Sequence, residues 1–296
     1  MLVNTYLKYL ESENKSHNTI RGHKATINDF LETVGSDIKA LIPRDIAKYQ
    51  KKLVDEGRTV GTINTHVKRL KVFFKWLEAN GHMKEDITKQ VKMKREVNTS
   101  VKWLSGEQTD LLLRSAYKEF LDRKRPKLRE YTVITTLLYT GLRVEELTNL
   151  ESKDVVLNKR FIRVRNGKDG LFREVPINDS LYKDLKAYKE GYTPKGSYLF
   201  DTNRSDKMTT RAVNHLLAKF NSVSDSKGKV TIEKLHAHML RHTFAKSLVN
   251  KGVSIEEVAV LLGHMRNDGT PNTLMTARYV KSSQENLLDS VNKLDY

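Results

Sequence analysis

The sequence predicts a mainly α-helical protein of two domains: four helices first, then a mostly helical domain that contains a small antiparallel β-sheet. Three observations lead to this prediction. Apolar residues recur at helical spacing through residues 1–92. The hydrophobic period changes to two between residues 154 and 177, as in short strands. Between the two parts, periodicity fades and basic residues accumulate, so we place a basic linker at 93–103 and the second domain at 104–296.

Four amphipathic segments make up the first domain. Ser16 or Asn18 is expected to cap the second helix, Pro43 to lie in the first turn of the third, and Thr59 or Thr62 to open the fourth. Each helix would bury one apolar face against the others. The residues that define these faces include Leu2, Tyr6, Leu7, Leu10, Ile20, Ile27, Phe30, Leu31, Ile63, Val67, Leu70, Phe73, Phe74 and Leu77.

The second domain combines helices with three short strands. The strands are DVVL, FIRVR and FREVPI, separated by Asn158-Lys159 and by a turn with glycines at 167 and 170. Such short connections predict antiparallel pairing. Helices are expected near 105–121 and 129–140, after Asp179, and near 209–222, 236–250, 254–262, 272–280 and 284–293.

The charge of the chain points to a polyanionic partner. Lys and Arg number 53 against 36 Asp and Glu, a formal net charge of +17, and both halves of the chain are basic. Nucleic acid is the partner that such a balance favours, and a merely soluble, lysine-rich protein is the alternative. The candidate DNA contacts are Lys68, Arg69, Lys71 and Lys75 on the solvent side of the fourth helix, and Lys94 and Arg95 at the linker. A solvated charged surface would explain them as well.

Composition also excludes several classes of protein. The chain has no cysteine, which excludes disulfides, thiolate zinc sites and cysteine nucleophiles. No apolar run approaches the roughly 18 residues of a membrane span, and the polar start is no secretory signal. We therefore expect a cytoplasmic protein.

Two candidate residues lie before and within the predicted sheet. In YTGLRVEEL, Gly141 ends one helix and Arg143 opens the next, so the guanidinium projects from a fixed backbone. Its planar fork suits a phosphate, and Glu146 lies on the same helix face and could hold the fork. Lys168, at the tip of the hairpin, could enter a DNA groove or donate a proton. An ordinary surface ion pair and an exposed turn lysine are the alternatives.

A third pattern is LHAHMLRHTFA. His238 and Arg241 share a helix face, which would pair a proton-transfer group with a phosphate clamp. His238 and His242 have the spacing of zinc ligands, but no carboxylate or cysteine completes a site. We interpret His242 as a hydrogen-bonded structural histidine and expect no metal and no other cofactor.

The last pattern lies near the C-terminus. Residues 253–264 have the appearance of a helix-turn-helix, His264 follows its glycine, and Tyr279 lies in an expected helix beyond. A phenol with a pKa near 10 is a weak nucleophile unless cations favour the phenolate. Arginines and histidines could supply them.

Taken in order, Arg143, Lys168, His238 with Arg241, His264 and Tyr279 resemble the active site of the tyrosine recombinases, the phage-integrase and Xer-like family. TGLRVEEL resembles the first arginine box of the family, HMLRHTFA the second, and LLGH the third. The resemblance covers the catalytic half, and the first domain is similar to the family's core-binding domain. One departure is the longer stretch after His264, where MRNDGTPN, residues 265–272, looks like an insertion. Tyr296 is a second, weaker candidate nucleophile.

The resemblance implies a mechanism. Arg143, supported by Glu146, and Arg241 would hold the oxygens of a DNA phosphate, and His264 would hydrogen-bond one of them. Tyr279 would attack the phosphorus and form a 3′-phosphotyrosyl link, with Lys168 as general acid for the 5′ oxygen. His238 would assist proton transfer from the tyrosine. Repeated exchanges would pass through a Holliday junction without ATP or metal.

The resemblance also implies partners. Relatives act as tetramers on two double-stranded DNA sites with paired inverted binding sites, so residues 284–296 could dock into a neighbouring subunit or pack onto their own domain. A nucleoid-associated enzyme of a prokaryote or mobile element is expected, acting in integration and excision or in cointegrate or dimer resolution. A noncatalytic helix-turn-helix regulator and a type IB topoisomerase remain the alternatives.

Overall fold

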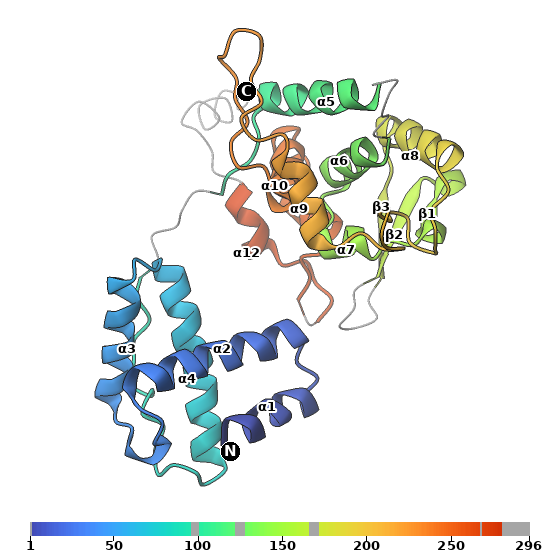
Figure 1. Ribbon diagram of the computed structural model, residues 1–296. Helices are drawn as coiled ribbons and strands as arrows, with labels where there is room; N and C mark the ends of the chain where they lie inside the picture. Colours follow the sequence, from blue (N-terminus) through green and yellow to red (C-terminus); the bar gives the residue numbers. More distant parts are fainter. Residues whose placement is uncertain (1, 96–100, 122–127, 166–171, 267, 280–296) are drawn as a thin grey trace, which may run out of the picture. The chain divides into compact units, whose positions relative to one another are not determined.

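The computed structural model describes residues 2–95, 101–121, 128–165, 172–266 and 268–279 (Figure 1). Its contacts divide the chain into two compact units, Met1–Thr99 and Ser100–Tyr296. The fold is mainly helical with one small antiparallel sheet, which confirms the predicted class. No helix of the described residues combines the length and the apolar character that crossing a bilayer requires.

The first unit contains the four predicted helices, α1 (Leu2–Ser12), α2 (His17–Val34), α3 (Pro43–Asp55) and α4 (Val60–Ala79), and a short turn η1 (Ile38–Ala40). Ser16 caps α2 by accepting the N–H of Thr19, and Thr59 caps α4 by accepting the N–H of Thr62. Caps of this kind satisfy the free N–H groups of the first turn. The helices enclose an aromatic core that includes Tyr6, Phe30, Tyr49, Phe73 and Phe74.

The cations of α4 differ in their surroundings. Lys68 and Lys75 are exposed, whereas Lys71 and Arg69 are half-buried. The Arg69 guanidinium lies over Gly22 of α2 and donates to the hydroxyl of Thr26 at 3.1 Å. Arg69 therefore does not lie on the solvent side as expected, because it stands at the flank of the buried stripe that faces α2.

The basic segment after the first unit's helices is partly anchored. Lys94 and Arg95 are exposed. The backbone of Lys94 exchanges two hydrogen bonds with the side-chain amide of Asn64. At the other end, the N–H of Leu104 donates to the Thr243 hydroxyl within the second unit. Both ends of the expected linker are thus attached to the unit they adjoin.

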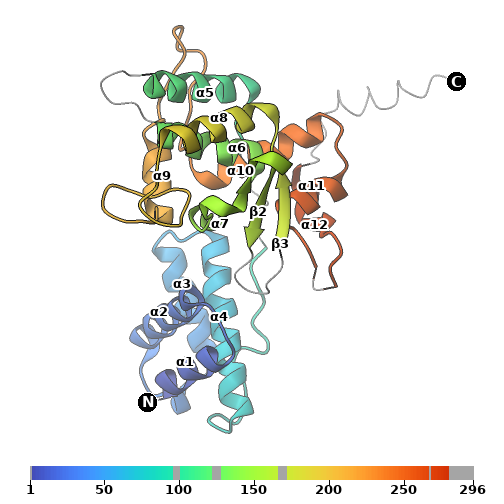
Figure 2. The same ribbon diagram turned by 90° about the vertical axis from the view of Figure 1, so that its right-hand side faces the viewer.

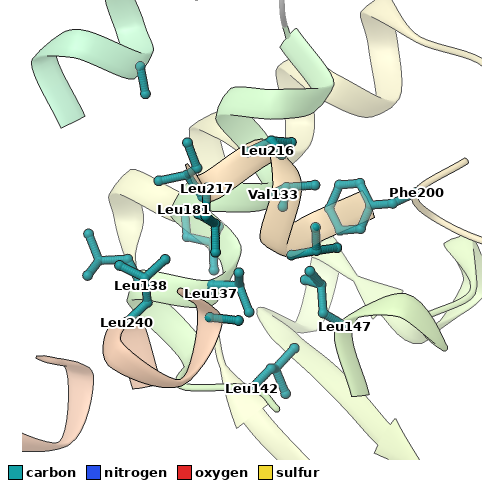
Figure 3. Packing of buried hydrophobic residues seen from close by; sticks show 14 of the residues in the cluster. Val133, Leu137, Leu138, Leu142, Leu147, Leu181, Phe200, Leu216, Leu217 and Leu240 are labelled. Carbon is teal, nitrogen blue, oxygen red and sulfur yellow. The ribbon is translucent and has the colours of Figure 1, made fainter. Parts of the chain in front are cut away.

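The second unit is built around the buried helix α6 (Leu128–Thr140). Leu137 and Leu138 of α6 lie among Leu181, Leu217 and leucines of other elements (Figure 3). The surrounding helices are α5 (Gly106–Phe120), α7 (Val144–Thr148), α8 (Asp179–Gly191), α9 (Thr210–Ala218) and α10 (Ala237–Asn250). The helix predicted at 209–222 is shorter in the structure. It ends at Ala218, and the chain then enters a loop in which Ser222 has a φ of +64°.

Three strands form the sheet, in the order β1 (Val155–Val156), β2 (Phe161–Arg165) and β3 (Phe172–Pro176), with single short turns η2 (Ser152–Asp154) and η3 (Leu157–Lys159) around β1. All pairs are antiparallel, and Ile162 faces Val175 across β2 and β3. Along β3 and just beyond it, Val175 and Ile177 point into the core. The helix α11 (Ile255–Leu262) lies beside β3 (Figure 2), and α12 (Thr273–Thr276) packs against α11.

The chain after α11 does not continue as a helix-turn-helix. Gly263 ends α11 with a φ of +65°, and a tight hairpin follows, in which Met265 pairs with Pro271. The expected helix 272–280 is only the single turn of α12 followed by η4 (Ala277–Tyr279). The predicted helix 284–293 lies outside the described residues.

Candidate active site

Arg143 is fixed at the first turn of α7. Gly141 ends α6 with a φ of +61°, a conformation that side-chain-bearing residues rarely adopt, and Arg143 then caps α7. The backbone N–H of Arg143 donates to Glu146 Oε2 at 2.8 Å, and its Nη1 donates to Oε1 at 2.9 Å. The side chain remains 40% exposed. Glu146 therefore holds the guanidinium in place, as the spacing predicts, and leaves it open to a ligand.

Glu146 is the anionic centre of a larger cluster. Burial raises the pKa of its carboxyl, but the hydrogen bond and charge of Arg173, with Arg143, outweigh this and lower the pKa to about 2. The carboxylate also lies 4.0 Å from the guanidinium of Arg241. One buried anion thus faces three arginines from three different elements.

Arg241 is almost entirely enclosed, with 1% of its surface exposed. Its Nη1 donates to the carbonyl of Gly141, and its Nη2 donates to that of Leu262, both at 2.6 Å. Burial and the neighbouring Arg143 lower its pKa to about 9, which leaves the guanidinium charged at neutral pH. The backbone carbonyls that end α6 and α11 thereby aim the second guanidinium.

His264 joins Arg241 to the tyrosine segment. Its Nε2 lies 3.0 Å from Arg241 Nη2, and its Nδ1 lies 3.0 Å from the hydroxyl of Thr276. Burial, followed by the positive charge of Arg241, lowers its pKa to about 3, so the ring is neutral. His264 thus occupies the centre of the site, next to one of the two predicted arginines.

The insertion closes on itself before the tyrosine segment begins. Its hairpin brings the N–H of Asn272 to 2.6 Å from the carbonyl of His264. Asn272 then caps α12, which leads directly to η4 and Tyr279. The extra residues therefore leave the docking of the tyrosine segment in place.

Tyr279 is buried, with 1% of its surface exposed, in the same unit as the arginines. Its hydroxyl lies 2.7 Å from Nδ1 of His242, and its carbonyl accepts from Lys246 Nζ at 3.1 Å. Burial raises the pKa of the phenol, while Arg241, Arg278 and Arg143 act to lower it. The phenol therefore lies within electrostatic reach of both predicted guanidinium groups.

His238 and His242 have different environments. His238 is exposed and lies on the wall of two open pockets of about 470 and 870 Å³, the smaller of which also contacts Arg143. Burial, and then Arg241, lower the pKa of His238. His242 is buried, its pKa is lowered to about 4 by burial and then by His238, and its ring lies 4.4 Å from that of His238. The interpretation of His242 as a hydrogen-bonded histidine is confirmed, with Tyr279 as its partner.

Not every predicted residue can be placed in this cluster. Lys168 lies outside the described residues, between the paired strands β2 and β3. Arg173, Arg278 and Lys246 belong to the cluster and were not singled out from the sequence. A signal for Arg173 existed, because it is a cation at a core-facing position of a strand whose next inward residue is Val175. Arg278 and Lys246 carry no comparable signal.

Comparison with known proteins identifies the family. Residues 102–286 match the phage integrase family, and residues 2–81 match the N-terminal SAM-like domain of phage integrases. The chain is also 30% identical to the tyrosine recombinase XerA of Pyrococcus furiosus, over 98% of this chain and 96% of that protein. This chain belongs to the phage integrase family of tyrosine recombinases. Its enzyme class is therefore that of a tyrosine-type site-specific recombinase.

Other tyrosine recombinases support this assignment. XerC of Corynebacterium glutamicum is 26% identical over 99% of this chain and 91% of its own. Among solved structures, the Tn1549 transposon integrase in complex with a circular intermediate DNA matches with a TM-score of 0.77 and 20% identity, over 99% of each chain. A lambda integrase dimer bound to a COC′ core site matches with a TM-score of 0.70 and 18% identity, over 94% of this chain and 93% of that one. The resemblance read from the motifs is confirmed.

Proposed function

We propose that this recombinase cleaves and rejoins duplex DNA through a covalent bond between Tyr279 and a 3′ phosphate. The observation that carries the proposal is the placement of Tyr279 against α10, the helix that carries Arg241: its hydroxyl lies 2.7 Å from Nδ1 of His242, and His264 joins Arg241 to the same tyrosine segment. A phenol needs cations nearby to become a nucleophile, and a phosphate transition state needs them to spread its charge. In the closed site burial keeps the pKa of the phenol raised, so the same two guanidinium groups meet both needs once the segment opens to the phosphate. Tyr279 is therefore expected to act in the site of its own chain.

The reaction follows from these groups. Arg143 and Arg241 bind the nonbridging oxygens of one phosphate, and His264 donates a further hydrogen bond from Nε2 once Arg241 has turned from that nitrogen to the phosphate. The phenol oxygen of Tyr279 attacks phosphorus, the bond to the 5′ oxygen breaks, and Lys168 gives that oxygen a proton. The energy of the phosphodiester is kept in the phosphotyrosyl bond, so rejoining needs no nucleotide. Attack by a 5′ hydroxyl of another strand then reverses the step and leads to a Holliday junction.

The tyrosine proton leaves through the histidines. The nearest acceptor to the phenol is Nδ1 of His242, at 2.7 Å, and the lowered pKa keeps that ring neutral and able to accept. His238 adjoins His242 and opens to the pockets beside Arg143. His238 thus assists the transfer by linking His242 to the surface.

Cleavage also requires the tyrosine segment to move. Tyr279 and Arg241 are each only 1% exposed, whereas Arg143 is open. A phosphate bound first at Arg143 reaches Arg241 and the phenol only after the segment 273–279 shifts. DNA binding and the opening of this segment are therefore coupled steps.

Double-stranded DNA is the proposed partner, which the DNA complexes of similar integrases support. We expect that DNA to carry paired inverted binding sites. The first unit would contribute Lys68, Lys71, Lys75, Lys94 and Arg95, of which Lys68, Lys75, Lys94 and Arg95 are exposed. A homotetramer on two sites, joined by residues 284–296, would carry out the exchange. The proposed roles are integration and excision or the resolution of cointegrates and dimers.

The test is to incubate the protein with suicide substrates made from the flanks of its own gene, in EDTA. The proposal expects a protein–DNA adduct that survives SDS and disappears on proteolysis, and strand exchange between two sites. A retarded complex without an adduct would indicate a noncatalytic regulator. An adduct with plasmid relaxation and no exchange would indicate a type IB topoisomerase, and cleavage abolished by EDTA a metal-dependent nuclease.

A further inference from the structure

Arg173 occupies an unusual position on β3. It lies on the inward face of the strand, two residues before the buried Val175, and its side chain is only 15% exposed. A buried cation is costly unless it is paired and hydrogen-bonded. No step of the proposed reaction uses Arg173 directly, so its burial calls for a different explanation.

The partner of Arg173 is Glu146, which it meets with both arms of the guanidinium. Nη1 donates to Oε1 at 2.9 Å and Nη2 to Oε2 at 2.7 Å. The same two oxygens accept from the side chain and the backbone N–H of Arg143. A two-bond pair of this kind fixes the plane of the carboxylate. The orientation of Glu146 that holds Arg143 is therefore set from the opposite side by Arg173.

Arg173 also reaches the end of α11. Its Nε donates to the carbonyl of Leu261 at 3.1 Å. The next carbonyl, that of Leu262, accepts from Nη2 of Arg241. Arg173 thus contacts both Glu146, which holds Arg143, and the end of α11, whose Leu262 carbonyl holds Arg241.

Gly263 leaves the space that this contact requires. A Cβ at Gly263 would lie 2.8 Å from Nη1 of Arg173, closer than real contacts allow, and the φ of +65° independently favours glycine. His264 follows immediately. The absence of a side chain at position 263 therefore lets the Arg173 guanidinium lie against the backbone just before His264.

We propose that Arg173 is a positioning residue for DNA cleavage, which orients Arg143 through Glu146 and holds the end of α11 that carries Arg241 and His264. The inference rests on the proposed cleavage reaction. Its substrate contact is indirect, because each of the three guanidinium nitrogens already bonds Glu146 or Leu261 and the side chain is only 15% exposed. Arg173 is also the second residue of β3, so it joins that strand to the arginine pair.

The first experiment measures single-turnover adduct formation at saturating protein. Arg173→Gln should slow the step on the order of 100-fold, the cost of displacing an active group by about 1 Å. DNA affinity should stay within about twofold of wild type, because phosphate contacts elsewhere supply it. Arg173→Lys should also be slow, because an ammonium cannot replace the two-armed pair. The matched control is Arg163→Gln, on the adjacent strand and 45% exposed, which should leave the rate unchanged.

The second experiment separates positioning from general stability. Without Arg173 the pKa of Glu146 rises, so the Gln variant should lose activity on the acid side at a higher pH than wild type. Arg173→Lys keeps the charge and should retain the acid limb of wild type. In a Glu146→Gln background, adding Arg173→Gln should cost less than about twofold further, because the two residues act as one unit.

The possible outcomes distinguish a failure of the proposed function from a failure of the role proposed for Arg173. If wild type forms no adduct, the proposed function fails and Arg173 is not the cause. If wild type forms an adduct and both folded Arg173 variants match it, the inference is overturned. Equal losses from Arg173→Gln with and without Glu146, together with an unshifted pH profile, would also overturn it. Should Arg173→Gln fail to fold, Arg173→Lys and the double variant carry the same comparison.

Discussion

His242 and Tyr279 are in direct contact, with Nδ1 of the histidine 2.7 Å from the phenol oxygen. The contact joins α10 to the end of η4. Two further bonds tie down the same segment: Lys246 donates to the carbonyl of Tyr279, and His264 contacts the hydroxyl of Thr276. The tyrosine segment is thus attached to α10 and to His264, the two parts of the site that precede it in the chain.

Removing the His242 ring should loosen this segment. His242→Ala leaves a buried phenol without a partner, at a cost of about 1–3 kcal/mol. Amide hydrogen exchange over residues 273–279 should therefore become faster. His242→Asn places an amide near the position of Nδ1 and should restore part of the protection. Unchanged exchange in the Ala variant would show that the hydrogen bond does not hold the segment.

Gly141 should be intolerant of a side chain. A Cβ there would lie 2.4 Å from the Phe244 ring and 3.1 Å from Leu262, and its φ is positive. Gly141→Ala should cost about 2–4 kcal/mol of stability through strain and overpacking. It should also slow adduct formation, because the Gly141 carbonyl holds Arg241.

Gly252→Ala is the matched control for this substitution. Its φ is +82°, but nothing lies within 4 Å of the added Cβ. It should cost only about 1–2 kcal/mol and leave adduct formation unaffected. Calorimetry of the full chain compares the two variants, and equal costs would contradict the packing argument.

Stability should fall as the pH drops below 6.5. The unfolded histidines take up protons near 6.5, whereas burial delays protonation to about 4 in His242 and about 3 in His264. Unfolding therefore binds protons between these values, and each histidine contributes a slope of about 1.4 kcal/mol per pH unit. His242→Asn should reduce the slope of unfolding free energy between pH 6 and 5 by about that amount. An identical slope would mean that His242 is not buried in its neutral form.

DNA affinity should depend on salt through exposed cations of α4. Lys68→Gln and Lys75→Gln should each weaken binding for all sequences and reduce the slope of log affinity against log salt by about 0.9. Lys8→Gln, at an exposed position of α1, is the control. Binding titrations at several salt concentrations measure the slopes. A slope lowered equally by all three would indicate only a general effect of net charge.

Much of the fold follows from local signals. The caps at Ser16 and Thr59 and the buried stripe of α4 mark the helices of the first unit, and the change of period marks the sheet. The ends of α9 and α12 are less predictable, because they depend on tertiary turns. Ser222 adopts a positive φ and donates to Ile232 across a loop, which no local pattern announces.

The residues of the site, like the elements of the fold, could be predicted only in part. The motifs around Arg143, Arg241, His264 and Tyr279 predict a cluster, and the structure brings these four residues together. The identity of the partners could not be predicted, because it depends on which elements pack against each other. His242 meets Tyr279 only once the insertion has closed, and Arg173 meets Glu146 only once β3 lies beside α7 and α11. A buried arginine in a strand indicates from the sequence that a partner exists, but it does not identify the partner residue.

The central claim is that the oxygen of Tyr279 becomes bonded to DNA. The most direct measurement digests the covalent adduct with protease and nuclease and locates the attached nucleotide by mass spectrometry. The account predicts the nucleotide on Tyr279, no adduct from Tyr279→Phe with DNA binding retained, and a normal adduct from Tyr296→Phe. An adduct mapped to Tyr296 or any other residue, or formed by Tyr279→Phe, would contradict it.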